Sequence, residues 1–96
     1  MLTGKQKRFL RSKANQLRPI FQVGKSGVNE NMIEQINEAL EKRELIKISI
    51  LQNCLEDKDT IAQDISTGTN SEVAQIIGNN IVLYKESVDH KTIILP

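Results

Sequence analysis

Apolar positions along the chain repeat with two different periods, and these periods predict alternating helices and strands. Leu10, Ala14 and Leu17 are separated by four and three residues, which is the spacing of the buried stripe of a helix. The segment Leu45–Leu51 instead alternates isoleucines with polar residues, which is the pattern of a strand whose two faces differ. The chain therefore has the signature of an α/β or α+β domain rather than of a helical bundle.

Capping signals place the ends of three helices. Thr3 and Gln6 have the spacing of a capping box at the start of the first helix, and Pro19 ends it by disfavouring helical geometry at the preceding residue. Asn29 is a good N-cap for the second helix, whose buried face begins at Ile33. For the third helix we expect the range Glu56–Thr67 with a C-terminal cap at Gly68.

Short strands are expected between and after these helices. The predicted strands are Ile20–Val23, Leu45–Leu51, Val73–Ile77 and Ile81–Lys85, with a further edge strand at Thr92–Leu95. A hairpin turn at Gly78-Asn79-Asn80 joins two of them, because asparagine tolerates the positive φ of a tight turn. The order αβαβαββ implies an α/β fold with a small mixed sheet and helices packed on it, as one domain over residues 1–96.

Charge is distributed unevenly along the chain, and this distribution indicates what kind of partner the protein binds. The first 29 residues carry seven Lys or Arg and no acidic residue, whereas the rest carry six basic and twelve acidic residues. A formal net charge of +1 therefore hides a basic segment that can attract a polyanion. The basic segment has no tryptophan and no broad apolar face, no segment approaches ~18 continuous apolar residues, and the N-terminus does not resemble a signal peptide. We accordingly expect a cytoplasmic protein that does not act on a membrane.

Few residues are suited to catalysis or metal binding. A single cysteine, Cys54, cannot form an intramolecular disulfide, and with the single histidine, His90, it makes no metal-ligand cluster. The acidic group Glu56, Asp57 and Asp59 is explained by the positive end of the third helix. We expect no cofactor, no metal, no small-molecule substrate and no enzymatic activity.

The segment Gly24-Lys25-Ser26-Gly27 is the strongest candidate for a binding site. Two glycines allow unusual backbone conformations, the following helix start offers free N–H groups, and Lys25 adds a cation at the tip. A GxxG loop clamps the nucleic-acid backbone in KH modules, although a plain turn of this composition is also common. The Gly-Lys-Ser run does not complete a nucleotide-binding P-loop, since that motif needs a glycine where Pro19 stands.

The only Phe, Trp or Tyr side chains are Phe9, Phe21 and Tyr84, and each lies in an element that needs core residues. Base stacking on an open sheet is therefore not expected. For a nucleic-acid partner, this favours contacts to phosphate, sugar and shape, and structured RNA over sequence-specific reading of duplex DNA.

Several segments together resemble the CRM domain, named for chloroplast RNA splicing and ribosome maturation, and more narrowly its stand-alone bacterial YhbY-type members. These segments are Lys5-Gln6-Lys7-Arg8, Leu17-Arg18-Pro19, Gly24-Lys25-Ser26-Gly27, Glu44-Leu45-Ile46-Lys47, Gly78-Asn79-Asn80-Ile81-Val82-Leu83-Tyr84-Lys85 and Ile94-Leu95-Pro96. Two positions depart from the pattern: Asn15 where a histidine is common, and Lys85 where an arginine is common.

The resemblance implies a fold like the C-terminal domain of bacterial translation initiation factor three, and RNA binding without catalysis. It implies association with precursors of the large (50S) ribosomal subunit through ribosomal RNA, and we expect a monomer. The expected RNA-binding residues are Lys5, Lys7, Arg8, Arg11, Arg18, Gly24, Lys25, Ser26 and Gly27. The leading hypothesis is that the basic helix and the loop form one continuous face. The alternative is a protein-interaction module that makes no direct RNA contact, which a position of Lys25 remote from the first helix would favour.

Overall fold

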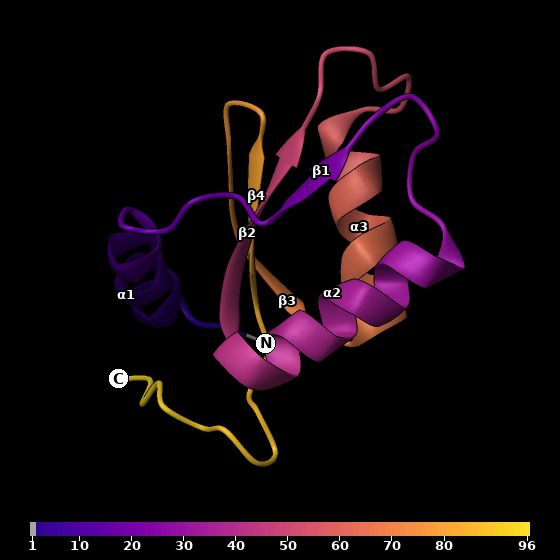
Figure 1. Cartoon of the computed structure of the whole chain (residues 1–96). Coiled ribbons are helices and arrows are strands. Elements are labelled where there is room, and N and C mark those ends of the chain that lie inside the picture. Colours follow the sequence, from indigo (N-terminus) through magenta and orange to yellow (C-terminus); the bar gives the residue numbers. More distant parts are fainter. Residues whose placement is uncertain (1) are drawn as a thin grey trace.

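The computed structural model describes residues 2–96, and within them the chain forms three helices and a four-stranded sheet (Figure 1). The observed order αβαβαββ is the predicted one. In chain order the elements are α1 (Gly4–Ala14), β1 (Phe21–Val23), α2 (Glu30–Arg43), β2 (Leu45–Ile50), α3 (Lys58–Thr69), β3 (Glu72–Ile77) and β4 (Asn80–Tyr84).

The sheet is mixed, as expected, with the strand order β1-β2-β4-β3. The short strand β1 pairs in parallel with β2, and its Phe21 lies opposite Ile48. The remaining neighbours are antiparallel, so that β4 runs between β2 and β3. This order leaves β1 as an edge strand with one hydrogen-bonding side open.

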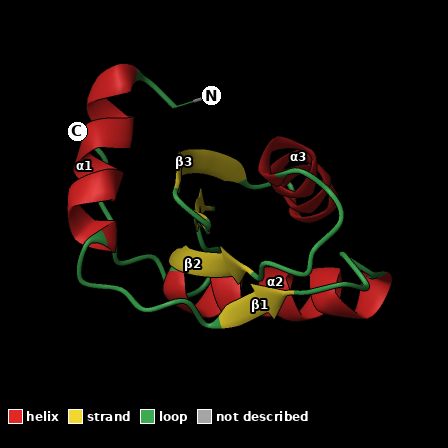
Figure 2. Ribbon diagram, turned by 90° about the horizontal axis from the view of Figure 1, so that it is seen from above, coloured by secondary structure: helices red, strands yellow, loops and turns green. Residues whose placement is uncertain are grey.

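Helices cover both faces of the sheet (Figure 2). On one face α2 and α3 bury the larger core, to which Ile36, Ile48 and Ile61 contribute. On the other face α1 buries a smaller cluster that contains Leu10 and Val82. Because both faces are covered, β4 is a nearly continuous apolar run rather than an alternating one.

Local capping signals located the helix starts well. The Thr3 hydroxyl accepts from the Gln6 N–H at 3.1 Å, and the Gln6 side chain accepts from the Thr3 N–H at 3.0 Å, which confirms the capping box. Asn29 caps α2, as predicted, by accepting from the Met32 N–H at 2.8 Å. α3 begins two residues later than expected, because Asp57 is its N-cap and accepts from the Thr60 N–H.

The helix ends were predicted less accurately. α1 ends at Ala14 with Asn15 as its C-cap, well before Pro19. The chain then runs from the helix to the edge of the sheet (Figure 1). Gly68 does not cap α3 but lies inside it, where a Cβ would come within 3.1 Å of Ile33. The cap is Asn70, whose φ of 54° places it in the left-handed region.

The hairpin between β3 and β4 is confirmed, but its positive φ is at Gly78 and not at the asparagines that follow. The expected strand at Thr92–Leu95 is wrong: the N–H groups of Thr92 and Ile93 donate to the Glu44 carboxylate at 2.7 and 2.8 Å. A side chain thus takes the place of a neighbouring strand for this segment.

Two carboxylates of α2 and its C-cap hold the C-terminal segment, residues 85–96. Hydrogen bonds from the Val88 N–H, the Ser87 hydroxyl and further donors lower the pKa of Glu41 from 4.5 to about 2. Burial disfavours the charged form of Glu44, but hydrogen bonds from backbone N–H groups outweigh it and lower the pKa of this carboxyl. Glu41 therefore anchors the C-terminal segment and is not simply a solvated acidic residue of α2.

Candidate nucleic-acid interface

The basic residues of α1 lie on its outer surface, as the helical spacing predicted. Lys5, Lys7, Arg8 and Arg11 are all exposed, while Leu10 on the same helix is fully buried. No ion pair or side-chain hydrogen bond within residues 2–96 involves these four cations. Because no carboxylate neutralises them, their charge is available to an external anion.

The GxxG loop, which we define as Gly24–Gly27, is a tight turn between β1 and α2. The Gly27 N–H donates to the Gly24 carbonyl at 3.0 Å and closes the turn, which exposes Lys25 and Ser26 at its tip. The N–H groups of Lys25 and Ser26 meet no acceptor within residues 2–96. The loop therefore offers two backbone donors and one ammonium group to an anion.

Only one of the two loop glycines is required by the backbone. Gly27 has a φ of 69°, and a Cβ there would lie 2.9 Å from Glu56 Oε1. Gly24 has no positive φ, and its Cβ would make ordinary contacts of 3.6 Å with Asn53 and Leu51. The expectation that both glycines serve the conformation thus holds for Gly27 alone.

The structure does not place the loop beside α1. Both Figure 1 and Figure 2 show α1 on one side of the molecule and the loop after β1 on the other, next to the connection between β2 and α3. The two basic regions are joined through the segment from Asn15 to Ile20, which crosses toward the sheet edge (Figure 1). The expectation that the basic helix and the loop form one continuous face is therefore wrong for these two elements alone.

Basic side chains do, however, lie between these two regions. Arg43, at the end of α2, lines a depression of about 370 Å³ together with Lys13 of α1. Arg43 also lines a much smaller depression with Arg18 and Lys47, which adjoins the start of β1. The path from α1 to β1 therefore carries Lys13, Arg43, Arg18 and Lys47, and we call these four residues the basic bridge.

Sequence reasoning missed Arg43 as a site residue and left the role of Lys47 open. Arg43 lies in a helix rich in acidic residues, so its surroundings in the sequence point away from a phosphate site. Lys47 belongs to the polar face of β2, which was the one available signal, and the fold leaves it half-exposed. Lys85, by contrast, donates to Asn37 Oδ1 at 2.8 Å, which holds its ammonium group on α2.

Three other residues singled out in the sequence, Asp57, Cys54 and His90, lie away from these cations in the sequence. Within residues 2–96 no cluster of His, Cys, Asp or Glu has the arrangement of a metal site. The Thr60 N–H lowers the pKa of Asp57, which is explained by its role as an N-cap. Cys54 is half-buried after β2, and the exposed His90 has its Nδ1 3.2 Å from Glu41 Oε2.

Comparison with known proteins places the chain in a family. The model of the CRS1/YhbY (CRM) domain matches residues 2–85, and the chain belongs to this family, as its sequence motifs indicated. Bacillus subtilis (strain 168) has a relative named "Probable RNA-binding protein YqeI" that is 68% identical over 96 residues and 100% of both chains. A relative in Haemophilus influenzae, named "RNA-binding protein", is 36% identical over 94% of this chain and 91% of its own length.

Two further comparisons extend the relationship. A Methanocaldococcus jannaschii protein named "Probable RNA-binding protein MJ0652" is 40% identical over 86 residues. The match covers 88% of this chain and 63% of that longer protein. The solution structure of the hypothetical protein SAV1595 from Staphylococcus aureus is similar over 100% of both chains, with 57% identity and a TM-score of 0.84. The fold is therefore one that an experimental structure of a close relative also has.

Among residues 2–96 no helix combines the length and apolarity needed to cross a membrane.

Proposed function

We propose that this chain is a non-catalytic RNA-binding protein of the cytoplasm that acts in ribosome assembly by associating with large-subunit precursors through ribosomal RNA. The observation that carries the proposal is the set of exposed cations without carboxylate partners on α1 and at the tip of the GxxG loop. Family membership and the names of three relatives support RNA as the partner. The assembly role rests on the family resemblance.

In this proposal the protein binds the RNA backbone over an extended path rather than at one point. Lys5, Lys7, Arg8 and Arg11 provide one contact region, the GxxG loop provides another, and the basic bridge, which includes Arg18, lies between them. Phosphate contacts of this kind give affinity and position but little sequence information. A structured RNA that presents phosphates on a curved surface suits such a path.

The proposal is tested by sedimentation of the protein from a cell extract through sucrose gradients at low and moderate salt. Co-migration with large-subunit precursors that is lost as salt rises is the expected result, because electrostatic binding to RNA releases counterions. Migration as free protein at both salt concentrations contradicts the assembly role. Lys25→Glu should weaken the association, whereas Lys91→Glu is a control with the same charge change at a residue paired with Glu86 on the C-terminal segment.

A protein-interaction module is the second candidate, and one observation favours it. Lys25 lies away from α1, so the two basic regions are able to dock separate partners. Direct binding of purified protein to ribosomal RNA fragments separates the two candidates. If the purified chain binds no RNA at low salt, while the extract still shows co-migration, a ribosomal protein is the partner.

A further inference from the structure

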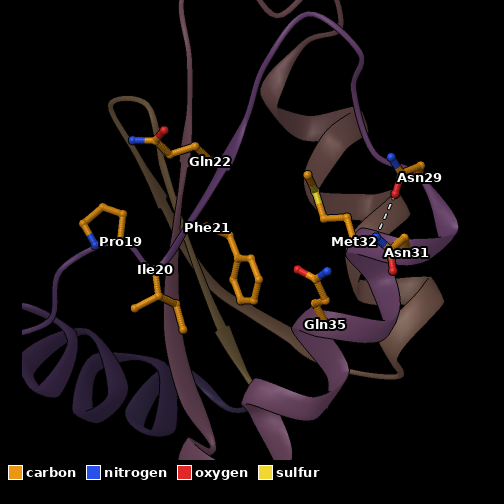
Figure 3. Close-up of a pocket in the computed structure, with 8 residues that line it drawn as sticks. All are labelled: Pro19, Ile20, Phe21, Gln22, Asn29, Asn31, Met32 and Gln35. Carbon is orange, nitrogen blue, oxygen red and sulfur yellow. Dashed lines mark hydrogen bonds between the residues drawn. The ribbon is translucent and has the colours of Figure 1, made fainter.

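A groove between β1 and the N-terminal half of α2 lies beside the GxxG loop, and the proposed function gives it no role. It has a volume of about 470 Å³, which falls within the roughly 300–1,000 Å³ of small-molecule sites (Figure 3). Residues on both sides of the loop line it, since Gln22 precedes the loop and Asn29 follows it. The groove also shares Ile20 with the depression of the basic bridge.

The lining of the groove is polar at the rim and apolar beneath. Asn31 and Gln35 of α2 are exposed amides, and Figure 3 shows the Gln35 side chain directed toward Phe21 of β1. Phe21 and Met32 are half-buried and pack against the larger core, so they form a fixed apolar floor. The sequence suggested that Phe21 is a core residue. In the structure its side chain also lines a surface groove.

This chemistry suits a nucleobase better than a phosphate. No charged side chain lines the groove, so it has no counterion for a phosphate. Side-chain amides both donate and accept hydrogen bonds, as the edges of bases do, and an aromatic ring or a thioether accommodates the face of a base. The Asn29 side-chain oxygen already accepts a hydrogen bond as the cap of α2. The amides of Asn31 and Gln35, on the same face of the helix, have no hydrogen-bond partner within residues 2–96.

The open edge of β1 and the charges at its two ends complete the site. β1 has no strand neighbour on its outer side, so backbone donors and acceptors point outward along the groove. Arg18 precedes the first lining residue, Pro19, and Lys25 follows the strand; both are exposed and have no ionic partner within residues 2–96. A single strand laid along β1 would meet a cation at each end and an uncharged groove in the middle.

We propose that the β1–α2 groove binds unpaired bases of a single-stranded RNA segment whose phosphates lie against Arg18 and the GxxG loop. This inference rests on the proposed RNA binding and adds to it a preference for unpaired nucleotides. A duplex cannot enter in this way because its bases are stacked and paired, and its backbone reaches only the cations.

The test compares Gln35→Ala with the matched control Gln63→Ala, a change of another exposed amide on the surface of α3. Both replacements favour helix formation, so neither is expected to unfold the protein. Affinities are measured for a short single-stranded RNA and for a blunt RNA duplex of the same sequence. A second variant, Asn31→Ala, repeats the measurement at the other unpaired amide.

We expect Gln35→Ala to weaken binding of the single strand by about tenfold and to leave duplex binding unchanged, since one good amide–base contact discriminates by roughly that factor. Gln63→Ala should change neither affinity. Equal weakening for both RNAs, or no change in either groove variant, overturns the groove assignment while RNA binding itself stands. If the unaltered protein binds neither RNA, the proposed function fails and the groove assignment fails with it.

Discussion

At the scale of single residues, the two glycines of the GxxG loop are predicted to differ in their effect on stability. Gly27→Ala places a Cβ at a φ of 69° and 2.9 Å from Glu56, so we expect a loss of about 1–2 kcal/mol in the free energy of unfolding. Gly24→Ala meets only contacts of 3.6 Å and should be nearly neutral. Denaturant unfolding of the two variants checks this, and equal losses would contradict the assigned backbone geometry.

Glu56 is an acidic residue next to the loop and should oppose anion binding there. Its carboxylate lies against Gly27, so a bound phosphate would experience repulsion that Glu56→Gln removes. We expect the affinity for RNA to rise roughly two- to fivefold, because a charge pair a few Å apart near water is worth about 1 kcal/mol or less. Glu38→Gln, on the exposed side of α2, is the control and should leave affinity nearly unchanged. A loss of affinity in Glu56→Gln would show instead that the carboxylate supports the loop.

At the scale of elements, the packing of α3 on α2 depends on a glycine that the sequence suggested was a cap. A Cβ at Gly68 would lie 3.1 Å from two Ile33 atoms, so Gly68→Ala should cost about 1 kcal/mol through overpacking in spite of its better helix propensity. In an Ile33→Val background the same change should cost less, because one of the close atoms is gone. Thermal or denaturant unfolding of the four proteins in the cycle gives the coupling. Stabilisation by Gly68→Ala alone would mean that the helices move apart freely.

The attachment of the C-terminal segment makes stability depend on pH in the acid range. Glu41 has a pKa of about 2 in the folded chain against 4.5 ordinarily, and the pKa of Glu44 is also lowered. Because both folded values lie below the unfolded ones, their stabilisation is complete above about pH 5 and is lost as the pH falls toward 2. Glu41→Gln should lower the midpoint of thermal unfolding at neutral pH and flatten its decline between those pH values. An unchanged decline would show that Glu41 does not hold the segment.

These elements also show which parts of the structure were accessible to sequence reasoning. The capping residues Thr3 and Asn29 act within one helical turn, so local sequence was enough to place them. Gly68 and the segment after Tyr84 were misassigned because the contacts that decide them, with Ile33 and Glu44, come from residues far away in the sequence. The same limit applies to the candidate site. The sequence showed the cations, but their separation and the position of Arg43 depend on how the segment after α1 reaches the sheet edge.

At the scale of the whole molecule, the two basic regions and the bridge between them make the extent of the RNA contact measurable. The logarithm of the RNA-binding constant falls linearly with the logarithm of the salt concentration, and each phosphate contact contributes roughly 0.7–0.9 to this salt slope. A variant with Lys7, Arg8 and Arg11 changed to alanine should therefore lower the slope by about two to three units. Lys25→Glu should lower it by about one unit. The regions are far apart in both views of the fold, so the two losses should add in the combined variant. If RNA lies along the whole path, Arg43→Ala should also reduce the slope by about one. If α1 binds a protein partner, the α1 variant keeps the full slope with purified RNA, and its defect is seen only in the association with ribosomal particles.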